Sequence, residues 1–216
     1  MTTDLEASRV IEAARTVLPT MYGRFEAIGF FDLFTGEEHL ALISPFGVGT
    51  SAAPPLVRVQ SECLTGDVFG SERCDCGPQL ERALSLVAGR PGLVVYLRGH
   101  EGRGVGLLAK LQAYRLQDQG FDTVDAQLEL GLPVDDREYG AAAAILQASE
   151  ATRIRLLTNN PRKVDALQAA GIDIDSVEPL HIPPTPTNAA YLRAKRDRLG
   201  HHLPPDPPAK TANNTQ

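Results

Sequence analysis

Three cysteines lie close together in the sequence, at Cys63, Cys74 and Cys76, and the chain has no others. Such clustering favours metal binding over disulfides, because an odd number of thiols cannot all pair within one chain. Three thiolates can hold zinc in a tetrahedral site whose fourth position stays open for a water nucleophile. Two alternatives remain: three buried structural cysteines, or a closed structural zinc site that a histidine, such as His100, completes.

Two loops could bind anions. The first, Arg98–Gly106, contains four glycines, which let the backbone approach a ligand closely. The second, Thr158–Lys163, places an asparagine and a proline where a helix would begin. Both loops lie between a predicted strand and a predicted helix, and the amino terminus of a helix favours anions. The alternatives are a tight turn with solvated charges and a helix start that is merely well capped.

The segment Asp135–Tyr139 places carboxylates on both sides of Arg137. An acid beside an arginine could serve in acid/base chemistry. The spacing of Asp135 and Glu138 is equally that of a capped helix start, and the pattern alone leaves both interpretations open. The remaining histidines and a basic run we interpret as structural or solvent-exposed: His39, His181, His201, His202 and Arg193–Arg198.

The hydrophobic pattern predicts an α+β fold, a single domain with a mixed β-sheet flanked by helices. Strands are predicted at residues 22–31, 39–43, 57–60, 93–97, 154–157 and 174–181. Helices are predicted at residues 4–17, 77–88, 107–118, 139–148, 161–170 and 188–199, with a short helix that Thr123 caps and that ends near Gly131. The domain spans residues 1–202, and residues 203–216, rich in Pro, Asn and Thr, are predicted to be disordered.

Composition narrows the classes of function. The formal net charge is −6, so bulk charge gives no reason to expect binding to nucleic acid or to an acidic membrane. An anionic ligand would need a local basic site instead. No apolar run reaches the roughly 20 residues that span a bilayer. The first ten residues include acids and no apolar core, so we expect no export and a cytoplasmic location.

Five motifs together resemble the GTP cyclohydrolase II family in order and spacing. They are Val57–Gln79, Arg98–Gly106, Tyr114–Asp118, Pro133–Tyr139 and Thr158–Lys163, and Pro183–His201 resembles the carboxyl-terminal segment of the family. The resemblance runs from about Leu18 to His202. It implies a zinc-dependent hydrolase that opens the imidazole ring of GTP and releases formate and pyrophosphate. The product would be a diaminopyrimidine ribosyl phosphate, and the reaction would be the first step of riboflavin biosynthesis.

The resemblance also implies roles for individual residues. One zinc per subunit would be held by Cys63, Cys74 and Cys76. GTP would be bound by Arg58, Val59, Gln60, Ser61, Glu62, Gln79, Glu101, Gly102, Arg103, Thr123, Thr158 and Lys163. Asp135 would accept a proton, Arg137 would attack the α-phosphorus, and Tyr114 would assist opening of the imidazole ring. Magnesium would accompany the triphosphate, and the protein would form a homodimer.

One position departs from the family pattern. The family usually has histidine where this chain has Gln60, and a glutamine cannot carry a charge near pH 7. Strand alternation places Arg58, Gln60 and Glu62 on one face, with Val57, Val59 and Ser61 on the other. We therefore expect Gln60 to face GTP and to serve as a neutral hydrogen-bonding group.

Two other functions are compatible with these motifs. One is a paralogue that stops at the formamidopyrimidine nucleotide and serves a specialised pathway. In the family, the complete reaction is associated with a tyrosine at the position of Tyr114, which argues against this alternative. The other is a non-catalytic GTP-binding module with structural zinc, and the presence of both Asp135 and Arg137 argues against it.

Overall fold

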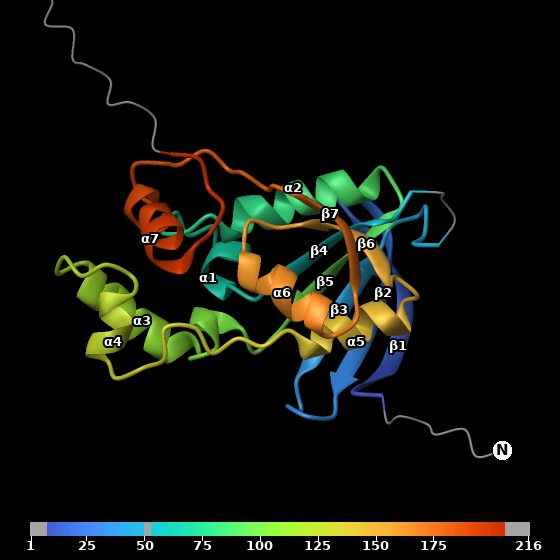
Figure 1. Ribbon diagram of the computed structural model, residues 1–216, viewed down its shortest axis with the longest axis horizontal. Helices are drawn as coiled ribbons and strands as arrows, with labels where there is room; N and C mark the ends of the chain where they lie inside the picture. Colours follow the sequence, from blue (N-terminus) through green and yellow to red (C-terminus); the bar gives the residue numbers. More distant parts are fainter. Residues whose placement is uncertain (1–7, 50–52, 206–216) are drawn as a thin grey trace, which may run out of the picture.

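Seven strands form one mixed sheet within residues 8–49 and 53–205, the residues that the computed structural model describes (Figure 1). The strands are β1 (Val10–Thr20), β2 (Gly23–Asp32), β3 (Glu38–Ile43), β4 (Leu56–Ser61), β5 (Gly92–Leu97), β6 (Arg153–Leu157) and β7 (Asp173–Glu178). Their order across the sheet is β1-β2-β3-β5-β4-β6-β7. The first four in this order pair antiparallel, and β5, β4, β6 and β7 run parallel. The expected α+β fold with a mixed sheet is confirmed.

Helices cover both faces of the sheet. They are α1 (Leu64–Asp67), α2 (Cys76–Ala88), α3 (Leu107–Gln117), α4 (Asp125–Glu129), α5 (Gly140–Ala148), α6 (Pro161–Ala169) and α7 (Ala189–Leu199), with a 3-10 helix η1 (Glu101–Arg103). Alternate residues of β4 divide between two cores, as strand geometry requires. Leu56 packs with α2, whereas Val57 and Val59 pack with α5 and α6. This register places Arg58 and Gln60 on the α2 face.

The three motif-bearing loops emerge at one end of the sheet. Strands β4, β5 and β6 are parallel neighbours, so their carboxyl ends lie at the same edge. The cysteine segment follows β4, the glycine-rich loop follows β5, and the loop before α6 follows β6. In open parallel sheets, ligands bind outside the carboxyl ends of the strands. Helices α3, α4 and α7 lie beyond this edge, at the opposite end of the molecule from β1 (Figure 1).

Residues 10–17 form most of strand β1, so the helix predicted at residues 4–17 is wrong over this part. Residues 4–7 lie outside the described residues. The β-branched residues of this segment favour a strand, and antiparallel pairing with β2 along its whole length supplies the partner. A tight turn fixes this hairpin, since the Thr20 hydroxyl accepts the N–H group of Gly23 at 3.2 Å.

The start of α4 also differs from the prediction. Asp122 Oδ1, and not the Thr123 hydroxyl, accepts the N–H groups of Val124 and Asp125, at 2.7 and 2.8 Å. The Thr123 hydroxyl instead accepts a hydrogen bond from Arg103 Nη2 at 3.3 Å. Thr123 therefore faces the glycine-rich loop, and Asp122 takes the capping role that was assigned to its neighbour.

The remaining predicted elements lie within a few residues of the observed ones. The predicted cap of α6 is confirmed, because Asn160 Oδ1 accepts the N–H group of Arg162 at 3.1 Å. The predicted disorder of residues 203–216 falls mostly outside the described residues, which end at 205. Within the part of the chain that the structure describes, no helix is long and apolar enough to cross a membrane.

Candidate active site

Three thiols converge between the end of β4 and the start of α2. Cys63 directly precedes α1, and Cys76 is the first residue of α2. The sulfur atoms of Cys63, Cys74 and Cys76 all lie within 4.8 Å of one another. Gly66 makes this approach possible, since a Cβ at that position would lie 2.9 Å from the Cys74 sulfur. The predicted cluster of cysteines is therefore present.

The thiol cluster fits a soft divalent cation. Hydrogen bonds with Cys74 and Cys76 and the charge of Lys110 lower the pKa of the Cys63 thiol. Contact with Cys63 in turn raises the pKa of Cys76, and it raises the pKa of Cys74 to about 11. Three thiolates this close therefore need a cation among them. Thiolate ligands of this kind favour zinc.

A closed site completed by His100 does not match the geometry. Among the described residues, the group with metal-ligand spacing consists of the three cysteines alone. The His100 ring instead contacts Ser61, with 3.1 Å between Nδ1 and Oγ. Burial and the nearby Arg137 lower the pKa of His100 to about 3, so the ring is neutral. Three protein ligands with an open fourth position are the arrangement typical of catalytic zinc.

Lys110 and Glu101 form a buried ion pair beside the sulfurs. Lys110 Nζ donates a hydrogen bond to Cys63 Sγ at 3.1 Å. The Glu101 carboxylate also accepts the N–H group of Leu64 at 2.6 Å, directly after the first cysteine. Hydrogen bonds to a ligating sulfur withdraw negative charge from it and orient it. Sequence reasoning missed Lys110, which lies on α3 between the motifs Arg98–Gly106 and Tyr114–Asp118 and belongs to neither.

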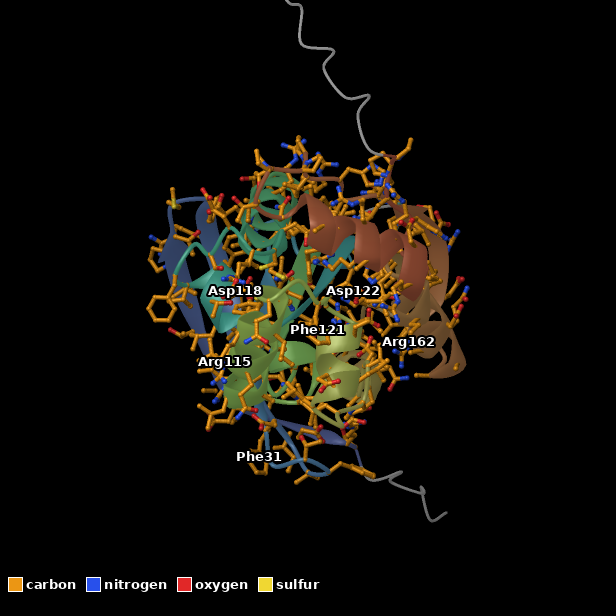
Figure 2. All side chains as sticks on the ribbon, turned by 90° about the vertical axis from the view of Figure 1, so that its left-hand side faces the viewer. Phe31, Arg115, Asp118, Phe121, Asp122 and Arg162 are labelled. Atoms are coloured by element: carbon orange, nitrogen blue, oxygen red, sulfur yellow. The ribbon has the colours of Figure 1, made fainter. Side chains whose placement is uncertain are left out.

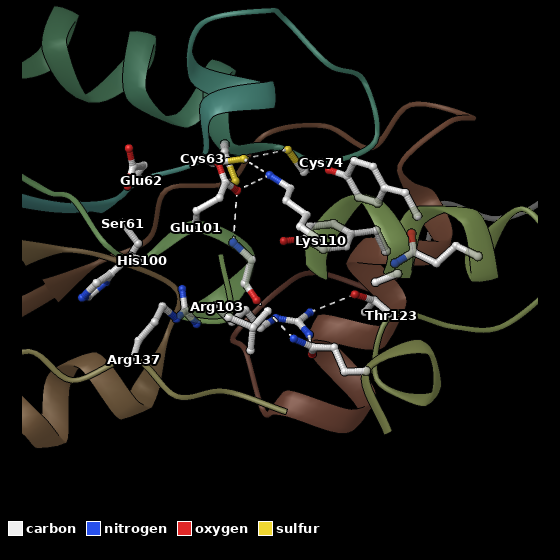
Figure 3. Close-up of a pocket in the computed structure, with 18 residues that line it drawn as sticks. Ser61, Glu62, Cys63, Cys74, His100, Glu101, Arg103, Lys110, Thr123 and Arg137 are labelled. Carbon is white, nitrogen blue, oxygen red and sulfur yellow. Dashed lines mark hydrogen bonds and ion pairs between the residues drawn. The ribbon is translucent and has the colours of Figure 1, made fainter. Parts of the chain in front are cut away.

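A cavity opens beside these sulfurs, and we call it the thiol cavity (Figure 3). The predicted site residues that line it are Ser61, Glu62, Cys63, Cys74, Cys76, Glu101, Gly102, Arg103, Tyr114, Thr123 and Arg137. In Figure 3, the amino group of Lys110 points toward the sulfurs, and Arg137 lies across the cavity from them. Tyr114 reaches in from α3, with 3.4 Å between its hydroxyl and that of Thr65.

A second cavity adjoins the first and is strongly cationic, and we call it the basic cavity. Five cationic side chains line it: Arg58, Arg103, Arg137, Lys163 and Lys195. Other side chains complete the lining, most of them neutral hydrogen-bonding groups: Gln60, Ser61, Cys76, Gln79, Thr158, Asn159, Asn160, Tyr191 and His201. The two cavities share Arg103, Arg137 and Tyr191, among others. A ligand longer than either cavity can therefore extend from the thiols to the cations.

The charges of the basic cavity are only partly compensated. Among the described residues, no ion pair joins Arg58, Arg103 or Lys163 to a carboxylate, although each has neutral acceptors. Lys163 Nζ, for example, donates to the carbonyl of Val59 at 2.5 Å. Burial lowers the pKa values of both Arg58 and Lys163, as expected for cations without a carboxylate partner. An anion entering this cavity would supply the missing charge.

Arg137 stands at the junction of the two cavities in a fixed orientation. Both oxygens of Asp135 accept hydrogen bonds from its guanidinium, at 2.8 Å from Nε and 2.8 Å from Nη2. Arg162 adds a second ion pair to the same carboxylate at 2.9 Å. Asp135 itself lines neither cavity. The carboxylate thus holds Arg137 from behind, while the guanidinium faces the cavities.

The segment that carries these residues is clamped to the sheet by Arg9. Its guanidinium donates to Asp32, the last residue of β2, and to Glu138, with 2.9 Å between Nη1 and Oε2. Glu138 also accepts the N–H group of Gly140 at the start of α5, at 2.8 Å. Of the two alternatives that the sequence left open, the pairing of Asp135 with Arg137 is present. The helix start capped by Asp135 is not, because α5 begins only at Gly140 and its N-cap residue is Tyr139, whose side chain caps no N–H group.

Gln60 lies in a buried hydrogen-bonded network that leads to the thiols. Its amide oxygen accepts from Arg58 Nη2 at 2.8 Å, and its amide nitrogen donates to Asp67 Oδ1 at 3.1 Å. The other oxygen of Asp67 accepts the N–H group of Cys63 at 3.0 Å. Gln60 lines the basic cavity but is only 1% exposed. Its contact with GTP stays a prediction, whereas its link between Arg58 and the cysteine segment is observed.

We expect Gln60→His to keep kcat/KM within about tenfold of the parent, because histidine can still donate and accept one hydrogen bond each. Gln60→Leu should lower kcat/KM more and reduce the free energy of unfolding by about 1–3 kcal/mol, since Arg58 and Asp67 lose a buried partner. Steady-state kinetics and denaturant unfolding measure both effects. Gln168→Leu, on the exposed side of α6, is the control. Parent-like kinetics and stability of Gln60→Leu would contradict the role of the network.

The structure brings nearly all predicted site residues to the two cavities. The exceptions are Asp135, which lies behind Arg137, and Val59, whose side chain is in the core. Sequence reasoning missed Lys110, and it took the histidines and basic residues after residue 188 as structural or exposed. Lys195 and His201 in fact line the basic cavity. The apolar residues of α7 gave no clear signal, because the buried Leu192 and Ala194 lie two residues apart and therefore do not share one side of the helix.

Comparisons with known proteins agree with this geometry. A family model described as GTP cyclohydrolase II matches residues 11–179. The chain is 55% identical over 190 residues to GTP cyclohydrolase-2 of Streptomyces coelicolor, covering 88% of this chain and 85% of that protein. It is 53% identical over 201 residues to riboflavin biosynthesis protein RibBA of Rhodococcus erythropolis, covering 90% of this chain and 46% of that protein.

Two further similarities concern longer proteins. The chain is 54% identical over 199 residues to RibBA of Mycobacterium tuberculosis, covering 90% of this chain and 46% of that one. It thus spans about half the length of these RibBA relatives. Among solved structures, RibBX of A. baumannii, a two-domain 3,4-dihydroxy-2-butanone 4-phosphate synthase, is 18% identical with a TM-score of 0.45. That similarity covers 82% of this chain and 41% of the solved one.

Proposed function

The chain belongs to the GTP cyclohydrolase II family of riboflavin-biosynthesis hydrolases, and we propose that it hydrolyses GTP with release of formate and pyrophosphate. One observation carries this proposal: a cavity beside three converging thiols adjoins a cavity with five cationic side chains. A nucleotide can present its base to the first and its phosphates to the second. Arg137, at the junction, would then face the α-phosphate.

The thiol cavity would host the chemistry at the base. Zinc held by the three cysteines would supply the Lewis acidity that makes a water nucleophilic near neutral pH. One water adds to C8 of the guanine and opens the imidazole ring to a formamide, and another hydrolyses the formamide to formate. Tyr114, which lines this cavity, would assist ring opening. Burial raises the pKa of its hydroxyl, which therefore remains a proton donor at neutral pH.

The basic cavity would host the chemistry at the phosphates. Release of pyrophosphate breaks the bond between the α-phosphorus and the bridging oxygen, and the charge that develops there needs cations around it. Arg58, Arg103 and Lys163 supply such charge, and Mg²⁺ would accompany the triphosphate. The Asp135 carboxylate contacts the Arg137 guanidinium directly. Asp135 would accept a proton from Arg137 if Arg137 attacks the phosphorus, and this direct contact supports that role.

A second candidate is a paralogue that releases pyrophosphate and stops at the formamide. The position of Tyr114 beside the thiols favours the complete reaction. The experiment is incubation of the purified, zinc-loaded chain with GTP and Mg²⁺, with formate and pyrophosphate quantified together. The proposal expects both in equal amounts. Pyrophosphate without formate would favour the paralogue, and GTP binding without either product would favour a binding module.

The assembly and location follow from the family resemblance alone. We propose that the protein works as a homodimer in the cytoplasm. Analytical ultracentrifugation of the chain, which has a mass of 23.2 kDa, should give a species of twice this mass. A monomeric species that turns over GTP at the full rate would contradict the dimer.

A further inference from the structure

Helix α7 follows the region that matches the family model, yet it contributes to both cavities. Tyr191 of this helix lines the thiol cavity and the basic cavity, and Lys195 lines the basic cavity, as does His201 directly after the helix. Figure 2 views the molecule onto α7, α3 and α4 and shows Asp122 at their boundary. Arg198 on α7 pairs with Asp122 at 2.5 Å, so the helix is tied down on this side. The side of α7 that bears Tyr191 and Lys195 faces the cavities.

Lys195 is the cation that α7 adds to the site. Its side chain is 12% exposed, and Nζ lies 2.7 Å from Oδ1 of Asp75, which is 2% exposed. The ammonium also lies 4.6 Å from the centre of the Tyr191 ring. Asp75 sits between two of the cysteines and has a second partner in Gln79, at 2.5 Å. A carboxylate with two partners does not depend on Lys195 alone.

Lys195 has N–H donors left to bind a further group. An ammonium has three N–H donors, and the contact with Asp75 uses one of them. Arg58 of β4 and Lys163 of α6 line the same cavity as Lys195 of α7. Three elements therefore each contribute a cation to the basic cavity. Cations on several sides of a cavity suit a polyphosphate ligand, because the negative charges of a polyphosphate are distributed over successive phosphate groups.

We propose that Lys195 is a substrate-binding residue for the phosphates beyond the α-phosphate of the nucleotide, and that α7 is a wall of the active site. This inference rests on the proposed function, because it assumes that the base occupies the thiol cavity. Pyrophosphate, the leaving group, would then occupy the same place before it departs. Inorganic pyrophosphate is thus a probe that contacts the Lys195 subsite without the base.

The test separates phosphate binding from pairing with Asp75. The variants are Lys195→Met, Lys195→Arg, and the double variant Asp75→Asn with Lys195→Met, in which no buried carboxylate is left without its ammonium. Each zinc-loaded full chain is titrated with inorganic pyrophosphate by calorimetry, and zinc content is measured. Arg193→Met, which removes the same charge from an exposed position of α7, is the matched control.

We expect Lys195→Met to weaken pyrophosphate binding at least about tenfold, the range for loss of a charged hydrogen bond. The double variant should be weakened equally and should keep its zinc, and Lys195→Arg should recover most of the affinity. Recovery of parent-like affinity in the double variant would overturn the proposal, since pairing with Asp75 would then be the whole role of Lys195. Parent-like affinity of Lys195→Met would overturn it as well.

The same measurements keep the two proposals apart. Absence of formate from the parent with GTP would reject the proposed function, whatever the variants do. If the parent releases formate and the Lys195 variants bind pyrophosphate as tightly as the parent does, the inference about α7 fails and the proposed function stands. If the Lys195→Met chain does not fold, the double variant and Lys195→Arg still give the comparison, because neither leaves Asp75 as an unpaired buried charge.

Discussion

Replacement of Cys74 by serine is expected to remove nearly all bound zinc and to abolish formate release. A serine hydroxyl stays protonated at neutral pH and is a poor zinc ligand, whereas a thiolate binds zinc strongly. Mutation of residues that only hydrogen-bond to metal ligands already lowers metal affinity by about 10- to 100-fold. Loss of a ligand itself should therefore lower zinc affinity by more than about 100-fold. Metal analysis after dialysis against a chelator measures the zinc, and a formate assay measures the activity.

The control for this variant is Ser71→Ala, in the same loop between the first two cysteines. It should keep one zinc per chain and parent activity. Pyrophosphate binding by the Cys74→Ser chain provides a second readout, since the basic cavity is lined by groups other than Cys74. Full zinc content in Cys74→Ser, together with parent activity, would mean that the thiol cluster is not the metal site.

The cysteine segment and the phosphate loops could be predicted because their geometry is local. Each loop follows a parallel strand, and parallel neighbours deliver their carboxyl ends to one edge. The alternation along β4 was equally predictable. It separates Arg58 and Gln60 from Val57 and Val59, and the structure confirms this division. The alternation of side chains along a strand was sufficient for these predictions, because pairing within the sheet preserves that alternation.

Contacts between residues far apart in the sequence could not be predicted. Lys195 meets Asp75 across 120 residues, and nothing in the basic run after residue 192 marks one of its cations as buried. Lys110 lies on a helix whose apolar and polar residues form no clear stripe, so its contact with Cys63 has no pattern behind it. In the segment that forms β1, the spacing of apolar residues was compatible with a helix. The segment forms a strand because its backbone pairs with β2, a contact that the local pattern does not reveal.

The two cavities suggest that the reaction at the base and the reaction at the phosphates can be separated by mutation. The thiols line mainly one cavity, and Arg58, Lys163 and Lys195 line only the other. Arg137 belongs to both. A change at this residue should therefore report on the phosphate chemistry while leaving the metal ligands intact.

Replacement of Arg137 by alanine is expected to lower kcat for pyrophosphate release by at least about 10²- to 10³-fold, the usual loss when a group that stabilises transition-state charge is removed. Zinc content should stay at the parent level, because within the described part of the chain Arg137 forms hydrogen bonds with Asp135 and with no cysteine. Arg137→Lys should also fail. A lysine keeps the charge but cannot reproduce the planar contact with both oxygens of Asp135.

Asp135→Asn then tests what the carboxylate contributes. Burial alone would raise the pKa of Asp135, but contacts with Arg137 and Arg162 outweigh this effect and lower it, so the group is a carboxylate. Asparagine keeps one acceptor and loses the charge. If Asp135 only orients Arg137, the variant should keep a larger share of kcat than Arg137→Ala does. If Asp135 accepts a proton during attack on phosphorus, both variants should lose kcat to a similar extent. Normal pyrophosphate release by Arg137→Ala or Arg137→Lys would reject the role of Arg137 in either case.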